Sequence, residues 1–351
     1  MSAFTKKART TIALLATMIA LLLTALPLST LSMATAQEND ELRDLKAQFK
    51  RPLDIPFPKD APYSPQMATL GKMLFFDPRL SGNKDLNCAS CHNPSFGYEV
   101  PLKTPIGTTK TPLKRQAPTL LNGAWITSFF WDGRAKTLEE QAKGPITADD
   151  EMGAKFPVII TRLKAIEEYK HWFATLFPRQ GLTKDAILTA IATYERTIVS
   201  GWAPFDRWVE GDEQALTAAQ KRGFQVFNGQ GRCASCHSGW LFSDNQFHDI
   251  GLPATDIGRG RFDRDNIFAK FAFKTPNLRN LSHRAPYMHD GSIATLEQVI
   301  ELYDSGGVKR LSRSPMIVPL NLSDQQKSDL LAFLQSLTAE RSNVTMPILP
   351  N

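Results

Sequence analysis

Apolar residues recur at helical spacing along much of the chain, whereas the alternation typical of strands is rare. Within 183–200, Ile187, Ile191, Tyr194 and Ile198 lie three or four residues apart, as on one face of a helix. Similar patterns predict helices over 41–51, 66–76 and 157–176. The last helix carries the apolar residues Leu330, Leu331, Phe333, Leu334 and Leu337. The chain is therefore predicted to be all-α.

Three helix starts are indicated by capping boxes, in which Ser or Thr is followed three residues later by Glu or Gln. They are Thr137 with Glu140, Thr217 with Gln220, and Ser323 with Gln326. We expect the first of these helices to end at Gly144 and Pro145, because proline lacks a backbone N–H and disrupts a helix interior.

Long irregular loops are expected between the helices. The proline-rich segment 52–65 has no helix or strand pattern and is predicted to wrap the surface. Segments 93–120 and 238–290 are also loop-rich. Loops of this length inside a compact domain are usually functional.

Residues 1–36 have the pattern of a signal peptide. Basic residues between Lys6 and Arg9 precede an almost wholly apolar stretch over 11–28, and Ala34-Thr35-Ala36 matches a cleavage pattern. An uncleaved membrane anchor is the alternative, since the apolar run is nearly long enough to span a bilayer. We expect cleavage and export to the periplasm, and no second run of spanning length follows in the sequence.

Charge and length narrow the class of protein. The net charge is +6 at pH 7, and residues 1–36 carry three basic residues and no acid, so the exported chain would be near +3. Basic residues are scattered and form no basic helix, which argues against nucleic-acid binding. The residues that remain after position 36 exceed what one core usually organises, so two domains are expected.

All four cysteines lie in two copies of one motif, Cys88-Ala89-Ser90-Cys91-His92 and Cys233-Ala234-Ser235-Cys236-His237. C-x-x-C-H is the attachment signature of c-type haem, in which two thiols bond the porphyrin and the histidine coordinates the iron. A zinc site or two disulfides are the alternatives. The two halves of a zinc site usually lie only tens of residues apart and need no histidine after each C-x-x-C. We therefore expect two covalently bound haem c groups.

The sequence that precedes each motif is also repeated. Gly71 and Phe75 precede the first motif, and Gly223 and Phe227 precede the second, with the same spacing inside a predicted helix. We predict two α-helical cytochrome c-like domains, each with one haem, over 37–205 and 206–345.

These features, together with several further motifs, resemble the bacterial di-haem cytochrome c peroxidases and their relative MauG. The resemblance covers nearly all of 60–340 and rests on the segments 115–119, 130–135, 144–146, 151–152, 275–280, 285–291 and 295–297. It implies that hydrogen peroxide is activated at the N-terminal haem and that the C-terminal haem relays electrons. The tryptophan of F-W-D-G-R-A, Trp131, would lie between the haems; otherwise it is a core aromatic residue.

The resemblance also implies an acid–base residue at the first haem. Glu151 and Pro145 would line the side of that haem opposite His92, where burial would raise the pKa of the glutamate. The alternative is an exposed glutamate on an acidic turn. Peroxidases that need prior reduction carry a histidine in the loop that here runs from Glu99 to Arg115, and this loop has none. The first haem should therefore be five-coordinate in the diferric protein, as in MauG.

At the second haem the resemblance places Tyr303 where related peroxidases have a methionine ligand, and tyrosine is the ligand type of MauG. A phenolate would stabilise ferric iron and favour a bis-Fe(IV) state. Met288 is the rival ligand, and a buried core phenol is the remaining reading. His248, His283 and His289 are expected nearby as structural residues.

Relatives usually hold a calcium ion between the domains. The matching ligands here are the side chain of Gln116 and the backbone carbonyls of Lys274 and Pro276. Glutamine is one methylene longer than the usual asparagine, so calcium is expected to bind more weakly.

Three functions follow from the resemblance. The favoured one is reduction of hydrogen peroxide with electrons from a small cytochrome c or cupredoxin. The second is MauG-type oxidation of a partner protein's side chains through the bis-Fe(IV) state, although MauG's surface tryptophan is replaced here by Gly231. The third is a non-enzymatic di-haem electron carrier, which would have two six-coordinate haems.

Overall fold

The computed structural model describes residues 40–253, 255–341 and 343–351. The predicted signal peptide lies outside the described residues. The chain divides into two compact units, 1–49 and 50–351. In the first unit residues 40–47 are helical, so this helix ends before the predicted position 51. All elements discussed below belong to the second unit.

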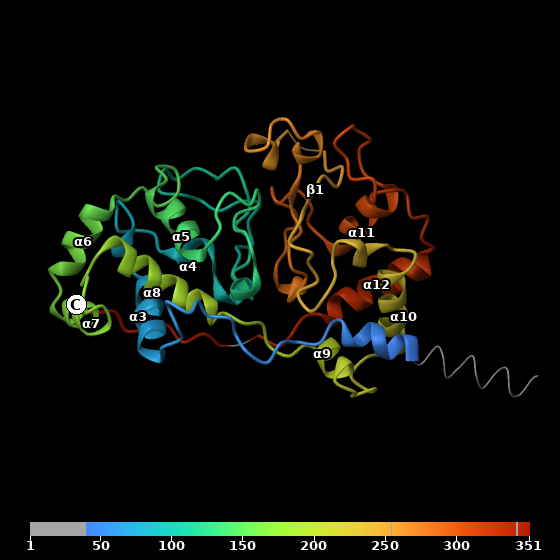
Figure 1. Cartoon of the computed structure of the whole chain (residues 1–351). Coiled ribbons are helices and arrows are strands. Elements are labelled where there is room, and N and C mark those ends of the chain that lie inside the picture. The colour runs from blue at the N-terminus through green and yellow to red at the C-terminus, as the bar shows by residue number, and fades with distance from the viewer. Residues whose placement is uncertain (1–39, 254, 342) are drawn as a thin grey trace, which may run out of the picture. The chain divides into compact units, whose positions relative to one another are not determined.

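Helices dominate the second unit, which confirms the predicted all-α class (Figure 1). The α-helices are α3 (Pro65–Phe76), α4 (Cys88–Cys91), α5 (Leu138–Thr147), α6 (Phe156–Lys164), α7 (Glu167–Leu176), α8 (Lys184–Arg196), α9 (Pro204–Val209), α10 (Ala218–Asn228), α11 (Leu296–Ser305) and α12 (Asp324–Ser336). None of the helices in the described part of the chain is long and apolar enough to cross a membrane.

Short elements connect these helices. The 3-10 turns are η1 (Pro78–Leu80), η2 (Pro94–Phe96), η3 (Gly123–Trp125), η4 (Cys233–Ser235), η5 (Arg259–Arg261), η6 (Ile267–Ala269) and η7 (Leu281–His283). β1 (Phe247–His248) and β2 (Phe273–Lys274) form an antiparallel pair in which Phe247 faces Lys274. The segments 93–120 and 238–290 are largely irregular, as predicted.

Two of the three predicted capping boxes are present. The side chain of Thr217 accepts a hydrogen bond from the Gln220 N–H, and Ser323 accepts one from Gln326, each with the reciprocal bond. At α5 the Thr137 side chain caps the Glu140 N–H, but the Glu140 carboxylate accepts from the backbone N–H of Lys136 instead.

The prediction that Gly144 and Pro145 end the helix after Thr137 is wrong. α5 continues to Thr147, and the Ala148 N–H donates to the Gly144 carbonyl at 3.0 Å. Proline lacks the N–H that would donate to the Gln141 carbonyl, so α5 loses one internal hydrogen bond there. Beyond the helix the Met152 N–H donates to the Pro145 carbonyl at 3.0 Å and satisfies that carbonyl.

The single helix predicted over 157–176 is two helices. α6 ends at Lys164 and α7 begins at Glu167, with Ile166 in an extended conformation between them. This break allows Leu163 of α6 and Tyr169 of α7 to be fully buried in one core. The next helix, α8, ends at Arg196, four residues before the predicted end at Ser200.

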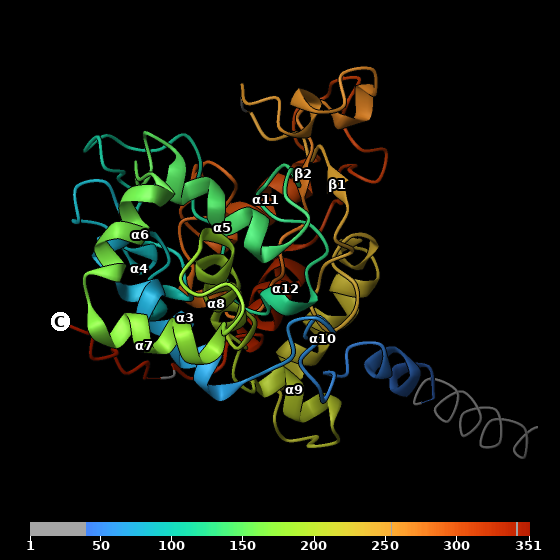
Figure 2. The same ribbon diagram turned by 60° about the vertical axis from the view of Figure 1, so that its left-hand side comes forward.

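The repeated glycines mark two close helix crossings. α3 packs against α8, and α10 packs against α12, as both views show (Figures 1 and 2). A Cβ at Gly71 would lie 1.9 Å from the Ala190 carbonyl oxygen, and one at Gly223 would lie 2.0 Å from that of Asp329. Each pair of helices can approach this closely only because the crossing residue lacks a side chain.

Aromatic rings fill the space around the second crossing. Phe333 of α12 contacts the rings of Phe205, Phe224 and Phe227 at centroid distances of 5.1 to 5.5 Å, and all four side chains are almost fully buried. The α10–α12 pair therefore carries much of the local core. The predicted domain boundary at 205/206 falls inside α9 and stays a prediction.

We expect Gly223→Ala to lower the free energy of unfolding by about 1–3 kcal/mol, because the methyl group would force α10 away from α12. The measurement is chemical denaturation of the haem-loaded protein followed by circular dichroism. Gly123→Ala is the control, since its added methyl would meet only a Leu138 side-chain carbon at 3.7 Å. Equal stability of both variants and the wild type would contradict the crossing argument.

Candidate functional site

The first C-x-x-C-H motif folds as a short capped helix. The Asn87 side chain accepts from the Ser90 N–H, and the Ser90 hydroxyl accepts from the Asn87 N–H, both at 3.0 Å. The Asn87 amide also donates to the Phe76 carbonyl at the end of α3. The helix α4 is thereby fixed to α3, and the His92 N–H donates to the Cys88 carbonyl at 2.9 Å.

The second motif forms the 3-10 turn η4, and its N-cap residue Arg232 makes no side-chain capping bond. It shares with the first motif the bond from the histidine N–H to the first cysteine carbonyl, here from His237 to Cys233 at 2.8 Å. The four cysteines form no disulfide with one another. The shared bond supports a common purpose of the two motifs.

Both motif histidines are oriented by a backbone carbonyl. His92 Nδ1 lies 3.1 Å from the Tyr98 carbonyl oxygen, and His237 Nδ1 lies 2.8 Å from that of Phe242. When Nδ1 donates to a carbonyl, Nε2 is left as the metal-binding atom. Burial lowers the pKa of His92 to about 4 and also lowers the pKa of His237, so both rings are neutral, as metal ligation requires.

Each motif lines its own large cavity. The first cavity, of about 370 Å³, contains Cys88, Cys91 and His92 in its wall. The second, of about 190 Å³, contains Cys233, Cys236 and His237. A haem attached at either motif would have its thioether bonds and its proximal ligand on one wall, so the residues fit the group.

The first cavity brings together the predicted acid–base residues. Pro145 and Glu151 line it with His92, and so do Gln141 and Arg134, which the sequence did not single out. Burial raises the pKa of the Glu151 carboxyl, the negative charge of Asp150 adds to this, and Arg134 opposes it. A carboxyl group with a raised pKa therefore shares a cavity with the first haem histidine.

A tight turn holds Glu151 in place. After α5 the chain folds back, with the Glu151 N–H donating to Ala148 at 3.1 Å and the Gly153 N–H donating to the same carbonyl at 2.9 Å. The loop before Arg115 covers this turn, because the Thr108 N–H donates to the Glu151 carbonyl at 2.8 Å. Glu151 is half-buried, whereas its neighbours Asp149 and Asp150 are exposed.

Trp131 lies between the two haem cavities. It lines both of them and also a smaller cavity that contains His92, Pro276 and Arg284. Its indole N–H donates to the Gln116 carbonyl at 2.8 Å, and its own carbonyl accepts from the Lys274 N–H at 2.8 Å. The tryptophan is thus anchored at both ends, by segments far apart in the sequence.

Ion pairs hold the turn that carries Trp131. Arg115 donates to Asp132 at 2.5 Å and to Asp256 at 2.7 Å, so it joins this turn to the loop after β1. Arg115 also holds the pKa of the Asp256 carboxyl well below its usual range, against the opposing effect of burial. The pairing fixes the relative positions of three loop segments at the cavity walls.

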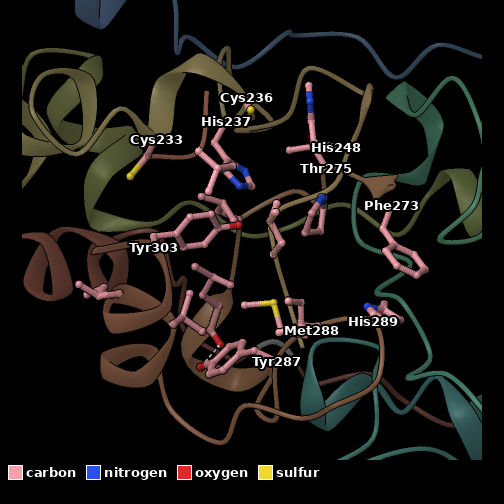
Figure 3. A pocket seen from close by; sticks show the side chains of 18 of the residues that line it. Cys233, Cys236, His237, His248, Phe273, Thr275, Tyr287, Met288, His289 and Tyr303 are labelled. Carbon is pink, nitrogen blue, oxygen red and sulfur yellow. Dashed lines mark hydrogen bonds between the residues drawn. The ribbon is translucent and has the colours of Figure 1, made fainter. Parts of the chain in front are cut away.

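The second cavity contains both proposed ligands of the second haem. Tyr303 of α11 and Met288 line it with His237, and Figure 3 shows the Tyr303 hydroxyl pointing toward the His237 ring. Burial raises the pKa of Tyr303 far above its usual range. A phenolate in this place requires a compensating positive charge, which ferric iron supplies when haem is bound.

The residues proposed for calcium lie close together around Trp131. The Gln116 amide nitrogen donates to the Val100 and Leu102 carbonyls at 3.1 and 2.9 Å, and its oxygen accepts from the Ala117 N–H at 2.9 Å. That oxygen keeps one lone pair for a cation. Lys274 and Pro276 line the same small cavity.

The three remaining histidines near the second haem motif make hydrogen bonds or ring contacts that suit structural roles. His248 Nε2 pairs with Asp244 at 2.8 Å, and this bond, with a further contact to Cys236, raises the pKa of His248 to about 10. His283 Nε2 lies 3.2 Å from the Ala339 carbonyl. The His289 ring stacks on Phe273 at 3.6 Å.

Two buried acidic side chains were not found from the sequence. Glu99 forms a buried ion pair with Arg284 at 2.8 Å, and both line the second cavity. Glu195 is buried on α8 and lines the first cavity. The pattern did contain a signal, because Glu195 continues the apolar series Ile187 and Ile191 at a spacing of four.

Taken together, the two cavities define a protein that carries two c-type haems in unlike surroundings. The sequence profile described as di-haem cytochrome c peroxidase matches residues 65–214, and that of cytochrome c matches 220–338. The methylamine utilization protein MauG of Methylorubrum extorquens is 48% identical over 320 residues, which are 90% of each chain. The cytochrome c551 peroxidase of Nitrosomonas europaea is 37% identical over 82% of this chain and 85% of its own.

A solved structure of a MauG-like protein associated with microbial copper homeostasis is similar, with a TM-score of 0.77 and 34% identity over 83% of this chain and 95% of that one. The chain belongs to the family of di-haem cytochrome c peroxidases and MauG, whose members are oxidoreductases. Membership implies two covalently bound haem c groups, in agreement with the two motifs.

Proposed function

We propose that the protein reduces hydrogen peroxide at the first haem, with electrons relayed through the second. The observation that carries this proposal is the half-buried Glu151 carboxyl, with its raised pKa, in the cavity of His92. Haem iron binds and activates peroxide when it keeps an open position. The chain's own part is to position the peroxide and to move its protons.

Glu151 suits the role of acid–base group. Reduction of peroxide requires a proton to leave one oxygen and arrive at the other, and a positioned carboxyl group can take up that proton and return it. No hydrogen bond occupies its carboxylate within the described part of the chain, so it is available to a small ligand. Pro145, in the same wall, presents no N–H to compete for that ligand.

Trp131 is proposed to relay electrons between the haems. The proposal is supported by the oxidisable indole of Trp131, which lines all three cavities. The two hydrogen bonds at Gln116 and Lys274 keep the ring in one position. A fixed ring suits electron transfer because little reorganisation accompanies the change of charge.

We propose Tyr303 as the distal ligand of the second haem, with Met288 as the alternative. The hydroxyl of Tyr303 points toward His237, the residue that would coordinate the opposite face (Figure 3). The first haem would then be open and the second closed. A non-enzymatic carrier would have both positions closed.

The second candidate function is MauG-type oxidation of a side chain in a partner protein. It is favoured by the 48% identity to a methylamine utilization protein MauG and by the tyrosine at position 303. Gly231 stands where MauG has a surface tryptophan, which favours a small cytochrome c or cupredoxin as the partner here.

Export to the periplasm is proposed from the leader pattern over 1–36 and from the chemistry of c-type haem, which is attached outside the cytoplasm. A calcium ion held by Gln116, Lys274 and Pro276 is proposed on the matching positions, next to Trp131.

We expect the ferric protein to consume hydrogen peroxide without prior reduction, in the presence of a reduced small cytochrome c. Glu151→Gln should lower the rate by about a hundredfold or more, because the amide cannot carry the proton. Asp149→Asn removes a nearby exposed carboxylate that does not line the cavity, and this variant should keep most of the rate. A requirement for prior reduction in the wild type, or full activity of Glu151→Gln, would contradict the proposal.

Electron paramagnetic resonance of the ferric protein should show one high-spin and one low-spin haem. Tyr303→Met should change only the low-spin signal and raise the reduction potential of that haem, because a thioether stabilises ferric iron less than a phenolate. Tyr287→Phe, in the same cavity, is the control. If Met288→Leu changes the low-spin signal and Tyr303→Met does not, Met288 is the ligand.

Calcium is tested by elemental analysis of the purified protein. We expect one calcium per chain. A chelator should remove it more readily from the wild type than from Gln116→Asn, because the shorter asparagine side chain suits the ion better. Absence of calcium from both proteins would remove the ion from the proposal without affecting the haem assignments.

A further inference from the structure

Glu195 is a second acidic residue in the wall of the first cavity. It lies near the end of α8, only 4% exposed, and lines the cavity with His92 and Glu151. Its Oε2 atom has no hydrogen-bond partner among the described residues. An ionised carboxylate in such a place would lose its hydration without compensation.

The charged groups around Glu195 do not compensate for its burial. Its neighbour Arg196 is engaged by Glu139 of α5 through two hydrogen bonds of 2.8 and 3.2 Å. The negative charge of Glu139 further disfavours ionisation of Glu195. From the haem motif, Cys88 is the titratable group that interacts with it.

The other residues packed near Glu195 on α8 and α3 carry no charge. On α8 itself the adjacent Tyr194 is a phenol whose pKa burial raises far above its usual range. The buried residues of α3, which packs against α8, are apolar side chains and a glycine. Arg134 and Glu151 also line the cavity, and the charge of Arg134 acts on the Glu151 carboxyl, whose pKa it lowers.

The result is a carboxyl group that keeps its proton at neutral pH. Burial raises the pKa of Glu195 to about 8, Glu139 adds to the rise, and Arg196 only partly opposes it. Below that pH the group is a neutral acid with an O–H to donate, and above it the proton is lost.

We propose that Glu195 is a proton-holding residue of the first cavity and supplies a proton to the space that it shares with Glu151. The inference rests on the proposed peroxide reduction. Each hydrogen peroxide takes up two electrons, supplied by the reduced donor protein, and two protons, and yields two waters. Glu151 moves a proton between the two oxygens of the peroxide. The two protons that the reaction consumes must enter the cavity from outside. Glu195 gives one of these protons and then regains a proton from solvent.

The first test is infrared difference spectroscopy of the ferric haem-loaded protein during a pH titration. The carbonyl stretch of a protonated carboxylic acid should be present at neutral pH and disappear as pH rises through about 8. Glu195→Gln should lack this band, whereas Glu167→Gln, with a side chain 86% exposed on α7, should retain it. A wild type without the band, or a Glu195→Gln variant that keeps it, overturns the proposal.

Glu139→Gln provides a test that a merely structural role of Glu195 would not satisfy. The substitution removes a negative charge and frees Arg196 to interact with Glu195, so the band should titrate at a lower pH than in the wild type. An unchanged or raised titration point would contradict the electrostatic account. Because this variant keeps Glu195 itself, the test holds even if Glu195→Gln fails to fold.

The third test of the proposal is the rate of peroxide turnover. The wild-type rate should fall as pH rises through about 8, and the Glu195→Gln rate should be lower by about tenfold or more and lack that step. An unchanged rate in Glu195→Gln overturns proton supply. If the wild type does not turn over peroxide, the proposed function fails, and the infrared titration still decides whether Glu195 holds a proton.

Discussion

The hydrogen bond from each haem histidine to a backbone carbonyl is the constraint on which both sites depend. Tyr98 and Phe242 provide these carbonyls, six and five residues after His92 and His237. The bond fixes both the tautomer and the ring plane, so that Nε2 faces the cavity. The crossings at Gly71 and Gly223 fix helices that contribute to the cavities. α8 supplies Glu195 to the first cavity, and α10 and α12 supply Phe227 and Leu330 to the second.

The two sites share this local geometry and differ in what surrounds it. Carboxyl groups reach the first cavity from the turn after α5 and from α8, and burial raises the pKa of both. The second cavity receives Tyr303 and Met288, and its buried carboxylate, Glu99, is paired with Arg284 at 2.8 Å. Since the motifs are the same five residues, the difference between the sites comes from the elements packed against them and not from the motifs.

Much of this could be predicted from the sequence where the determining contacts are local. The haem motifs, the capped starts of α10 and α12, and the all-α class depend on residues within a few positions of each other. The end of α5 could not be predicted, because the Pro145 carbonyl finds its donor, the Met152 N–H, only where the chain folds back after the helix. Likewise the break at Ile166 depends on which side chains the core can bury.

The candidate site shows the same limit. Glu151 and Trp131 were found through resemblance, but the bonds that hold Trp131 come from Gln116 and Lys274, which lie 15 residues before and over a hundred after it. Glu195 occupies an apolar position of a helix, and a sequence pattern treats such a residue as an exception. Only the arrangement of Glu139 with Arg196 shows why it is left without a counterion.

The pairing of Arg196 with Glu139 has a consequence for the cavity as a whole. A cation left free at that position would stabilise the ionised form of Glu195, and the cavity would then hold a fixed negative charge. With the cation neutralised, burial decides instead, and the acid stays protonated. The ion pair of Arg196 with Glu139 thus keeps the neighbouring acid, Glu195, neutral, and a neutral acid can give a proton to a cavity that must take in protons.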